Sequence, residues 1–160
     1  MTQNVNGDTI YQQKYGSTPT AASQAPGRVE ILGNHTDYNG GYVLTVAIDK
    51  TITLHGEATG DDEIILYSQT LDDEARFAID PIIKSESKPW ANYVLGVVDE
   101  LQKDGIPIGG FRAVIAGDLP IGAGVSSSAA LETATAFFLQ ALFPFSIEKM
   151  RLANLCRRAE

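Results

Sequence analysis

The chain has 160 residues, of which 44% are hydrophobic and 20% charged, a composition typical of a globular protein that buries a core. Its formal net charge is -8 and it has no basic stripe, which argues against nucleic acid as a partner. No apolar run approaches the roughly 18 residues that span a bilayer, so we expect no membrane partner. The polar segment 1–24 lacks the apolar stretch of a secretion signal, and we expect a cytoplasmic protein. Its single cysteine, Cys156, excludes an internal disulfide.

The first half of the chain is dominated by strand patterns. Segment 1–24 has no clear apolar period and is expected to form an N-terminal arm with a short helix around Ile10. From residue 25 to residue 160 we expect one folded lobe. Its short strands are predicted at 29–32, 42–48, 51–55, 64–67 and 76–79. Because segment 42–48 is mostly apolar, we expect it to be a buried strand.

The second half is dominated by helix patterns. An amphipathic helix is predicted over 90–101, with Gly105 as its stop signal, and a second helix over 130–142. Segment 111–116 between them is predicted to be a strand. A third helix is expected to begin near Ser146 and to continue at Glu160 without a stop signal, so we expect the native chain to be longer. Strands followed by helices favour an α+β fold, with a mixed sheet packed against helices.

A glycine- and serine-rich loop lies between the predicted strand 111–116 and the helix that follows. This segment, here called the serine loop, reads Leu119-Pro120-Ile121-Gly122-Ala123-Gly124-Val125-Ser126-Ser127-Ser128-Ala129-Ala130-Leu131-Glu132. A helix N-terminus has unpaired N–H groups and a positive dipole end, which suit a phosphate group. The spacing fits neither a Walker A loop nor a dinucleotide-binding loop. A glycine turn with one capping serine is the simpler alternative, but three consecutive serines exceed what capping requires.

A second polar loop lies near the start of the lobe. It reads Ala25-Pro26-Gly27-Arg28-Val29-Glu30-Ile31-Leu32-Gly33-Asn34-His35-Thr36-Asp37-Tyr38-Asn39-Gly40-Gly41. Asn34, His35 and Asp37 form a hydrogen-bonding set of the kind that binds sugar hydroxyls. A polar surface turn explains the same residues equally well, and Arg28 alone would pass for a solvated charge at a strand edge.

Taken together, the two loops resemble the motifs of one enzyme family. Pro-Gly-Arg-Val-x-x-x-Gly-x-His-Thr-Asp-Tyr-Asn-x-Gly resembles the galactokinase signature. The serine loop resembles the phosphate loop of the wider galacto-, homoserine-, mevalonate- and phosphomevalonate kinase superfamily. Trp90-Ala91-Asn92-Tyr93-Val94 resembles the galactokinase helix between them. The resemblance covers residues 25–160 and implies the N-terminal lobe of that kinase fold, incomplete at its C-terminus.

This resemblance implies a transferase of galactose metabolism that moves the γ-phosphoryl group of ATP to the anomeric hydroxyl of α-D-galactose, giving galactose 1-phosphate, with Mg²⁺ as cofactor. It implies that Arg28 stabilises charge developing at the reacting hydroxyl. The implied sugar-binding residues are Asn34, His35, Thr36 and Asp37.

The resemblance also implies how ATP and Mg²⁺ are held. Ser128 and Glu160 correspond to Mg²⁺ ligands, with Ser127 as the close rival of Ser128. Ser68 is a weaker match to a nucleotide contact, and Trp90 is either an adenine neighbour or a core anchor. The implied nucleotide-binding residues are Ser68, Gly122, Ala123, Gly124, Val125, Ser126, Ser127 and Ser128.

Two departures from the family pattern leave alternatives open. The family's catalytic aspartate lies in a Gly-Ile-Met-Asp segment that residues 1–160 do not contain, so we expect this chain by itself to be inactive. Asn34 stands where galactokinases usually carry glutamate. This difference leaves the identity of the sugar open and is the main support for an alternative reading, a kinase for N-acetylgalactosamine, a uronic acid or another sugar. A non-catalytic sugar and ATP sensor is a third reading, which the intact serine loop disfavours. The sugar, the native length and the oligomeric state stay open.

Overall fold

The computed structural model describes residues 6–33, 39–120 and 122–160. Their helices and strands are, in chain order, α1 (Gly7–Tyr15), β1 (Ala21–Leu32), β2 (Leu44–Ala58), β3 (Glu63–Ser68), β4 (Asp73–Ala78), η2 (Pro89–Ala91), α2 (Asn92–Lys103), β5 (Phe111–Gly117), α3 (Ser127–Leu142) and α4 (Lys149–Ala159). The predicted α+β class is confirmed. None of the helices in the described ranges is long and apolar enough to cross a membrane.

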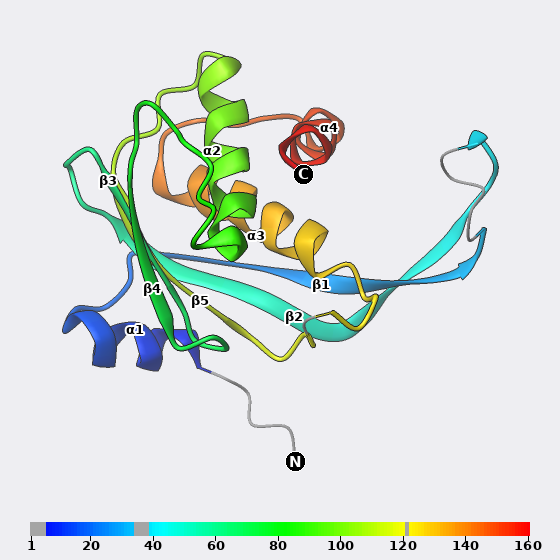
Figure 1. Cartoon of the computed structure of the whole chain (residues 1–160), viewed down its shortest axis with the longest axis horizontal. Helices are drawn as coiled ribbons and strands as arrows, with labels where there is room; N and C mark the ends of the chain where they lie inside the picture. Colours follow the sequence, from blue (N-terminus) through cyan, green and yellow to red (C-terminus); the bar gives the residue numbers. More distant parts are fainter. Residues whose placement is uncertain (1–5, 34–38, 121) are drawn as a thin grey trace.

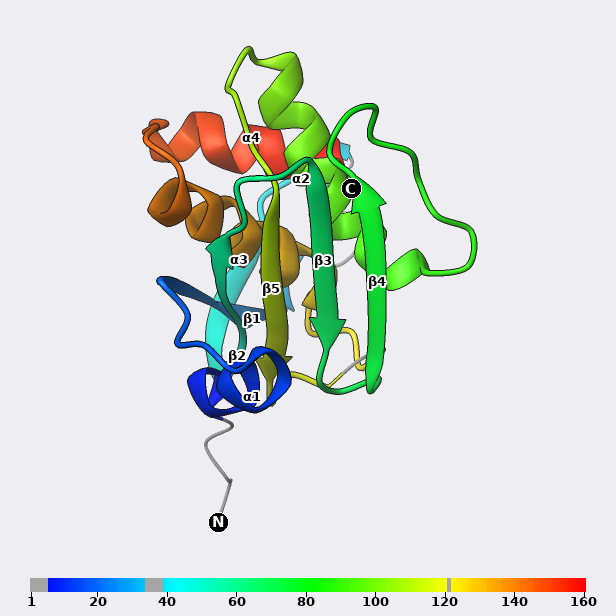
Figure 2. The same cartoon turned by 90° about the vertical axis from the view of Figure 1, so that its left-hand side faces the viewer.

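A five-stranded sheet of order β1-β2-β5-β3-β4 organises the lobe. Its neighbours run antiparallel except β3 and β5, which run parallel. Helices α2 and α3 lie over one face with α4 packed on them, whereas α1 covers part of the opposite face (Figures 1 and 2). The main core fills the space between the sheet and α2, α3 and α4, and includes Leu66, Leu95, Phe111 and Phe138.

The parallel pairing of β3 and β5 brings two chain segments to one edge of the sheet. Its register aligns Ile64 with Phe111 and Ser68 with Ile115, so both strands end on the same side. The chain leaves β5 at Gly117 and enters the serine loop from there. Ser68 and the serine loop are therefore neighbours, although some 50 residues separate them in sequence.

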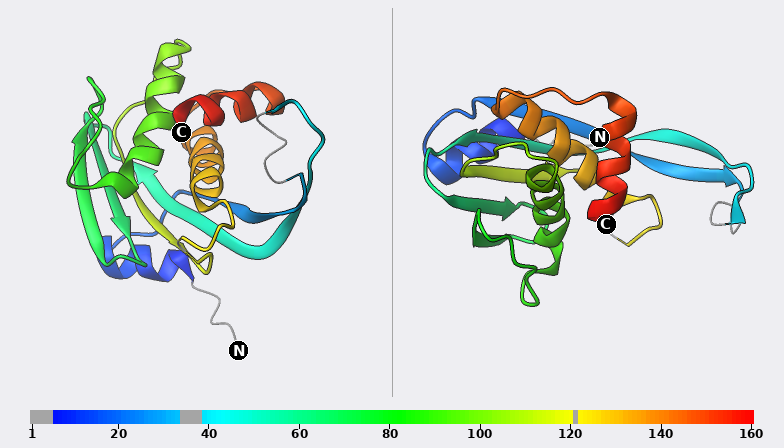
Figure 3. Two further views of the ribbon diagram at one scale, coloured as in Figure 1. Left: turned by 45° about the vertical axis from the view of Figure 1, so that its right-hand side comes forward. Right: turned by 90° about the horizontal axis from the view of Figure 1, so that it is seen from above.

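The prediction of a buried strand over 42–48 is wrong. Residues 44–48 of this segment and the segment predicted over 51–55 belong to one strand, β2, whose first half is exposed: Leu44 is 52% and Val46 45% exposed. Val43, which directly precedes β2, is 46% exposed. Strand β5 pairs with β2 only from Ile52 onward, so among the strands residues 44–47 pair with β1 alone. They form a two-stranded arm that extends beyond the helical layer (Figures 1 and 3).

The other predicted elements are confirmed with shifted ends. The strand predicted over 29–32 begins much earlier, at Ala21, because its first half pairs with β2 through Ala21 and Gly56. The helix predicted over 90–101 is η2 followed by α2, and Gly105, with φ +79°, follows it in the left-handed conformation that stops helices. The helix around Ile10 is α1.

Candidate functional site

The serine loop has an unusual backbone at the start of α3. Gly122 and Gly124 have φ values of +74° and +70°, a conformation that glycine adopts without steric cost. Ser126 also has a positive φ, +57°, which is uncommon for a residue with a side chain. It occupies the N-cap position, yet its side chain makes no capping hydrogen bond. The serine that follows the glycines is thus not used as a cap.

The first turn of α3 offers donors to a ligand. In any α-helix the first backbone amides have no acceptor within the helix. In α3 these are the amides of Ser127, Ser128 and Ala129, at the positive end of a 16-residue helix. This arrangement is suited to bind phosphate oxygens.

Strand β1 is joined directly to the serine loop. The backbone amide of Arg28 donates a hydrogen bond to the carbonyl oxygen of Val125, at 3.0 Å. Close packing next to it requires a glycine, since a Cβ atom at Gly27 would lie 2.3 Å from Leu119 Cδ1 and 3.0 Å from the same carbonyl oxygen. The two loops singled out in the sequence are therefore in contact at Gly27 and Arg28.

A cavity of about 340 Å³, here called the arginine cavity, opens beside this contact. Within it the Ser128 hydroxyl donates a hydrogen bond to the Glu160 carboxylate at 2.9 Å. The residues of the cavity that carry polar side chains include Arg28, Ser126, Ser128, Glu132, Arg157 and Glu160. The arginine cavity thus contains the predicted catalytic arginine and both predicted Mg²⁺ ligands.

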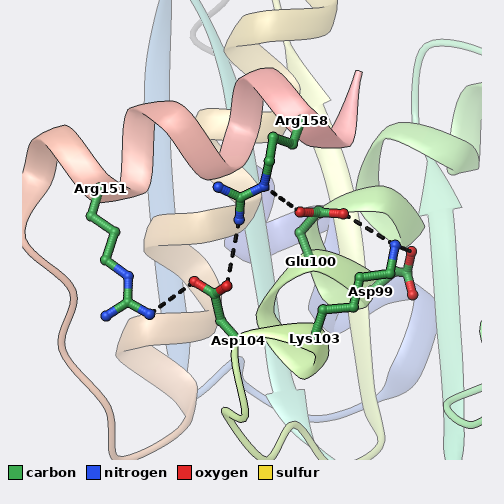
Figure 4. A network of polar contacts seen from close by, with 6 residues as sticks. All are labelled: Asp99, Glu100, Lys103, Asp104, Arg151 and Arg158. Atoms are coloured by element: carbon green, nitrogen blue, oxygen red, sulfur yellow. Dashed lines mark hydrogen bonds and ion pairs between the residues drawn. The ribbon is translucent and has the colours of Figure 1, made fainter.

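Glu160 reaches Ser128 because α4 is held against α2. The Arg158 guanidinium donates to Glu100 at 2.6 Å, and Arg151 donates to Asp104 at 3.0 Å (Figure 4). The hydrogen bond from Arg158 lowers the pKa of Glu100 below its usual range. These pairs link both the first and the last turn of α4 to the C-terminal end of α2.

The two helices also approach closely at one point. A Cβ atom on Gly96 of α2 would lie 2.5 Å from the carbonyl oxygen of Ala159, the residue before Glu160. Only glycine fits at this position without moving α4. The packing of Gly96 therefore helps to fix the position of Glu160.

A second cavity, of about 350 Å³, lies on the other side of the serine loop and is here called the tryptophan cavity. The Trp90 indole N–H donates to Asp73 at 2.8 Å, which fixes the ring at the cavity wall. Its residues include Ser68, Trp90, Tyr93, Gly122, Ser127 and Ser128. Ser128 lines both cavities, so a molecule that extends from one to the other would pass over the first turn of α3.

The structure brings most of the predicted site residues together. Arg28, Ser126, Ser128 and Glu160 line the arginine cavity, while Ser68, Gly122, Ser127 and Ser128 line the tryptophan cavity. Ala123 and Gly124 are exposed in the loop, and Val125 contributes its carbonyl oxygen to Arg28. The predicted sugar ligands Asn34, His35, Thr36 and Asp37 lie outside the described residues. The roles of all these residues stay predictions.

No group of three or more histidine, cysteine, aspartate or glutamate side chains is placed to hold a metal ion in the described part of the chain. The predicted Mg²⁺ pair consists of one hydroxyl, from Ser128, and one carboxylate, from Glu160. Two oxygens can suffice when substrate phosphates and water supply the other ligands of the ion.

The sequence reasoning assigned no role to Glu132, which is buried in the arginine cavity at 1% exposure. Its Oε1 atom has no hydrogen-bond partner among the described residues. Burial, together with the charge of Glu160, raises the pKa of Glu132 to about 7. Burial also raises the pKa of the neighbouring Cys156 to about 11, which leaves that thiol unreactive. The sequence signal for Glu132 was a charged residue within the apolar helix pattern, one turn after Ser128.

Two family profiles match the chain. One, described as the galactokinase galactose-binding signature, matches residues 9–57, and one for the N-terminal domain of the GHMP kinases matches residues 92–160. A galactokinase of Roseiflexus sp. (strain RS-1) is 43% identical over 150 residues, which are 94% of this chain and 38% of that protein. One from Chloroflexus aurantiacus is 35% identical over the same shares.

Solved structures agree with these matches. The Lactococcus lactis galactokinase, complexed with galactose, superposes with a TM-score of 0.86 and 31% identity, over 95% of this chain and 40% of its own. The mevalonate kinase of Methanococcus jannaschii follows with a TM-score of 0.78 and 26% identity, over 91% and 46% of the two chains. The chain spans about 38–40% of the galactokinases that it matches. It belongs to the galactokinase family, within the GHMP kinase superfamily, and corresponds to the N-terminal part of that fold.

Proposed function

We propose that the full-length protein, meaning the gene product that contains residues 1–160, transfers the γ-phosphoryl group of ATP to the anomeric hydroxyl of galactose. The galactokinase relatives and the galactose complex of the Lactococcus lactis enzyme support this activity. One observation carries it: the backbone of Arg28 is bonded to the serine loop, and its side chain shares a cavity with Ser128 and Glu160. Because ATP is an intracellular substrate, we place the reaction in the cytoplasm.

In this proposal the tryptophan cavity receives the nucleoside and the start of α3 receives the phosphates. Trp90 and Tyr93 provide an apolar wall of the cavity, and Ser68 adds a hydroxyl there. The free amides of Ser127 and Ser128 donate to phosphate oxygens. The positive φ values of Gly122 and Gly124 let the loop bend around the phosphates without side chains in the way.

Ser128 and Glu160 are the residues that would hold Mg²⁺. Hydroxyl and carboxylate oxygens are the hard donors that Mg²⁺ prefers, and these two lie 2.9 Å apart. The buried, unpartnered oxygen of Glu132 in the same cavity also fits a site for a cation. When bound, the ion supplies charge neutralisation on the phosphates.

Arg28 is proposed to act at the reacting hydroxyl of a sugar for which Asn34, His35, Thr36 and Asp37 are the proposed ligands. Its guanidinium is planar and carries several N–H donors, so it stabilises negative charge that develops on oxygen during transfer. Its side chain is exposed in the arginine cavity, where such a substrate would meet the serine loop.

Asn34 favours a second candidate substrate. Glutamate at this position would repel an acidic sugar, whereas asparagine accepts one hydrogen bond and donates another. A kinase for galacturonic acid or N-acetylgalactosamine is therefore the alternative.

The test is a sugar panel with the purified full-length protein and ATP. Galactose, N-acetylgalactosamine, galacturonic acid and arabinose are compared by ADP release, and the product is identified as the 1-phosphate by ³¹P NMR. We expect turnover with galactose and a lower KM for galactose in Asn34→Glu, because one charge-assisted hydrogen bond contributes about 1.5–3 kcal/mol, or roughly 10- to 150-fold in kcat/KM. Binding of sugar and ATP without ADP release from any sugar would instead indicate a sensor.

A further inference from the structure

Glu132 lies one helical turn after Ser128, on the same face of α3. Residues four apart on a helix are surface neighbours, and both side chains line the arginine cavity. Ser128 in turn is bonded to Glu160. Three oxygen-bearing side chains, from two helices, therefore meet at this cavity.

The burial of Glu132 lowers the stability of the folded chain in the absence of a bound partner. The residue is 1% exposed, and its Oε1 accepts no hydrogen bond within the described part of the chain. Arg28 and Arg157 line the same cavity, yet neither donates to this oxygen. A buried polar atom without a partner destabilises a protein, so this oxygen requires an explanation, and a bound ion is one that the cavity allows.

The other buried polar side chain in the described part of α3 has a hydrogen-bond partner. The hydroxyl of Thr135, which is fully buried, donates to the carbonyl oxygen of Leu131 at 2.8 Å. The lobe is thus able to pair a buried polar group on α3 with its own backbone. The free oxygen of Glu132 points to a partner that binds at the cavity.

We infer that Glu132 is a third member of the cation site of Ser128 and Glu160, and that its free carboxyl oxygen binds the hydration shell of the Mg²⁺ ion. This inference rests on the nucleotide and cation site of the proposed function, but not on which sugar is phosphorylated. Outer carboxylates of this kind orient metal ligands and neutralise charge. Glu132 is a positioning residue in this role and does not touch the reacting atoms.

The inference predicts that Glu132→Gln, in the full-length protein, loses no stability in the absence of metal but loses part of its Mg²⁺-dependent nucleotide binding. In EDTA at pH 8 its unfolding midpoint should equal or exceed that of the wild type, because the variant removes a buried, uncompensated charge. The affinity for a non-hydrolysable ATP analogue, measured by calorimetry, should be unchanged without Mg²⁺. The gain in that affinity on adding Mg²⁺ should shrink by about 10- to 100-fold, the usual effect of removing such a carboxylate.

Thr135→Val is the matched control, since it removes a buried polar group from the same helix away from the cavity. Its Mg²⁺-dependent gain should match that of the wild type. A gain in Glu132→Gln within about twofold of the wild type would overturn the inference, and so would a lower unfolding midpoint in EDTA, which would make Glu132 a structural residue. The sugar panel tests the kinase proposal independently. If the wild type phosphorylated no sugar, while Glu132→Gln still lost the Mg²⁺-dependent gain in nucleotide affinity, the kinase proposal would be refuted and the inference about Glu132 would stand.

Discussion

At the scale of single residues, the role proposed for Arg28 predicts an effect on the rate of phosphoryl transfer and not on the binding of ATP. Arg28→Ala in the full-length protein should lower kcat by about 10²- to 10³-fold, as the loss of one donor to a developing oxyanion does. The KM for ATP should change little, because the contact of Arg28 with the serine loop uses its backbone amide, which alanine keeps. Arg28→Lys should also be poor, since a point charge does not reproduce the planar guanidinium.

The control for Arg28 is Arg76→Ala. Arg76 is an exposed arginine on β4 that pairs with Glu63 and Glu74, away from both cavities. In steady-state kinetics, the kcat of Arg76→Ala should equal that of the wild type. If Arg28→Ala kept kcat within about twofold of the wild type, Arg28 would be an ordinary surface charge.

Glu132 predicts a pH dependence of stability in the absence of metal. Its pKa is raised to about 7 in the folded chain, above the usual value near 4.5. Between these two values the folded state binds more protons than the unfolded state, so the free energy of unfolding falls as pH rises and then levels off above pH 7. This one group contributes a slope of at most about 1.4 kcal/mol per pH unit. Urea denaturation in EDTA from pH 5 to pH 8 should show this loss in the wild type and not in Glu132→Gln; parallel curves for the two proteins would contradict the assignment.

At the scale of elements, the contact between α2 and α4 determines where Glu160 lies. Helix propensity alone predicts that Gly96→Ala stabilises α2 by about 1 kcal/mol. The close approach of Ala159 predicts the opposite, a net loss of about 1–3 kcal/mol, because the added methyl group must displace α4.

Two measurements check this prediction. Chemical denaturation should show a lower stability for Gly96→Ala, and the apparent KM for Mg²⁺ should rise as Glu160 moves away from Ser128. Asp99→Ala is the control, since Asp99 lies on α2 and pairs only with the exposed Lys103 among the described residues. It should stay within about 0.5 kcal/mol of the wild type. A more stable Gly96→Ala protein with unchanged Mg²⁺ dependence would show that α4 adapts freely.

At the scale of the whole molecule, the 160 residues contain the loop proposed to bind phosphate and the proposed catalytic residue Arg28. They do not contain a Gly-Ile-Met-Asp segment, in which the resemblance places the catalytic base. We therefore expect the purified 160-residue chain to release no ADP above background with ATP and galactose. A coupled assay measures this, with the full-length protein as the positive control. Galactose-dependent ADP release by the 160-residue chain would mean that another group takes the part of the base.

Features that depend on local structure could be predicted from the amino-acid sequence. The spacing of apolar residues predicts the class of the fold and the helices at 90–101 and 130–142. The positions of glycine and serine residues predict the two loops, because these residues affect backbone conformation and helix ends. The resemblance added the roles proposed for Arg28, Ser128 and Glu160. These features lie within short segments, so no knowledge of distant contacts was needed.

Features that depend on contacts between distant segments could not be predicted in this way, and they became apparent only in the folded structure. The apolar residues Val43, Leu44 and Val46 predict a buried strand, but burial depends on whether β5 and the helices extend over them, and they do not. In the sequence, Glu132 is one charged residue within a predicted helix. It is buried only because α4 packs over it. The hydrogen bond between Ser128 and Glu160 likewise arises only from the packing of α4 on α2 and α3, because burial and long-range pairing are properties of the packed layers and not of any one segment.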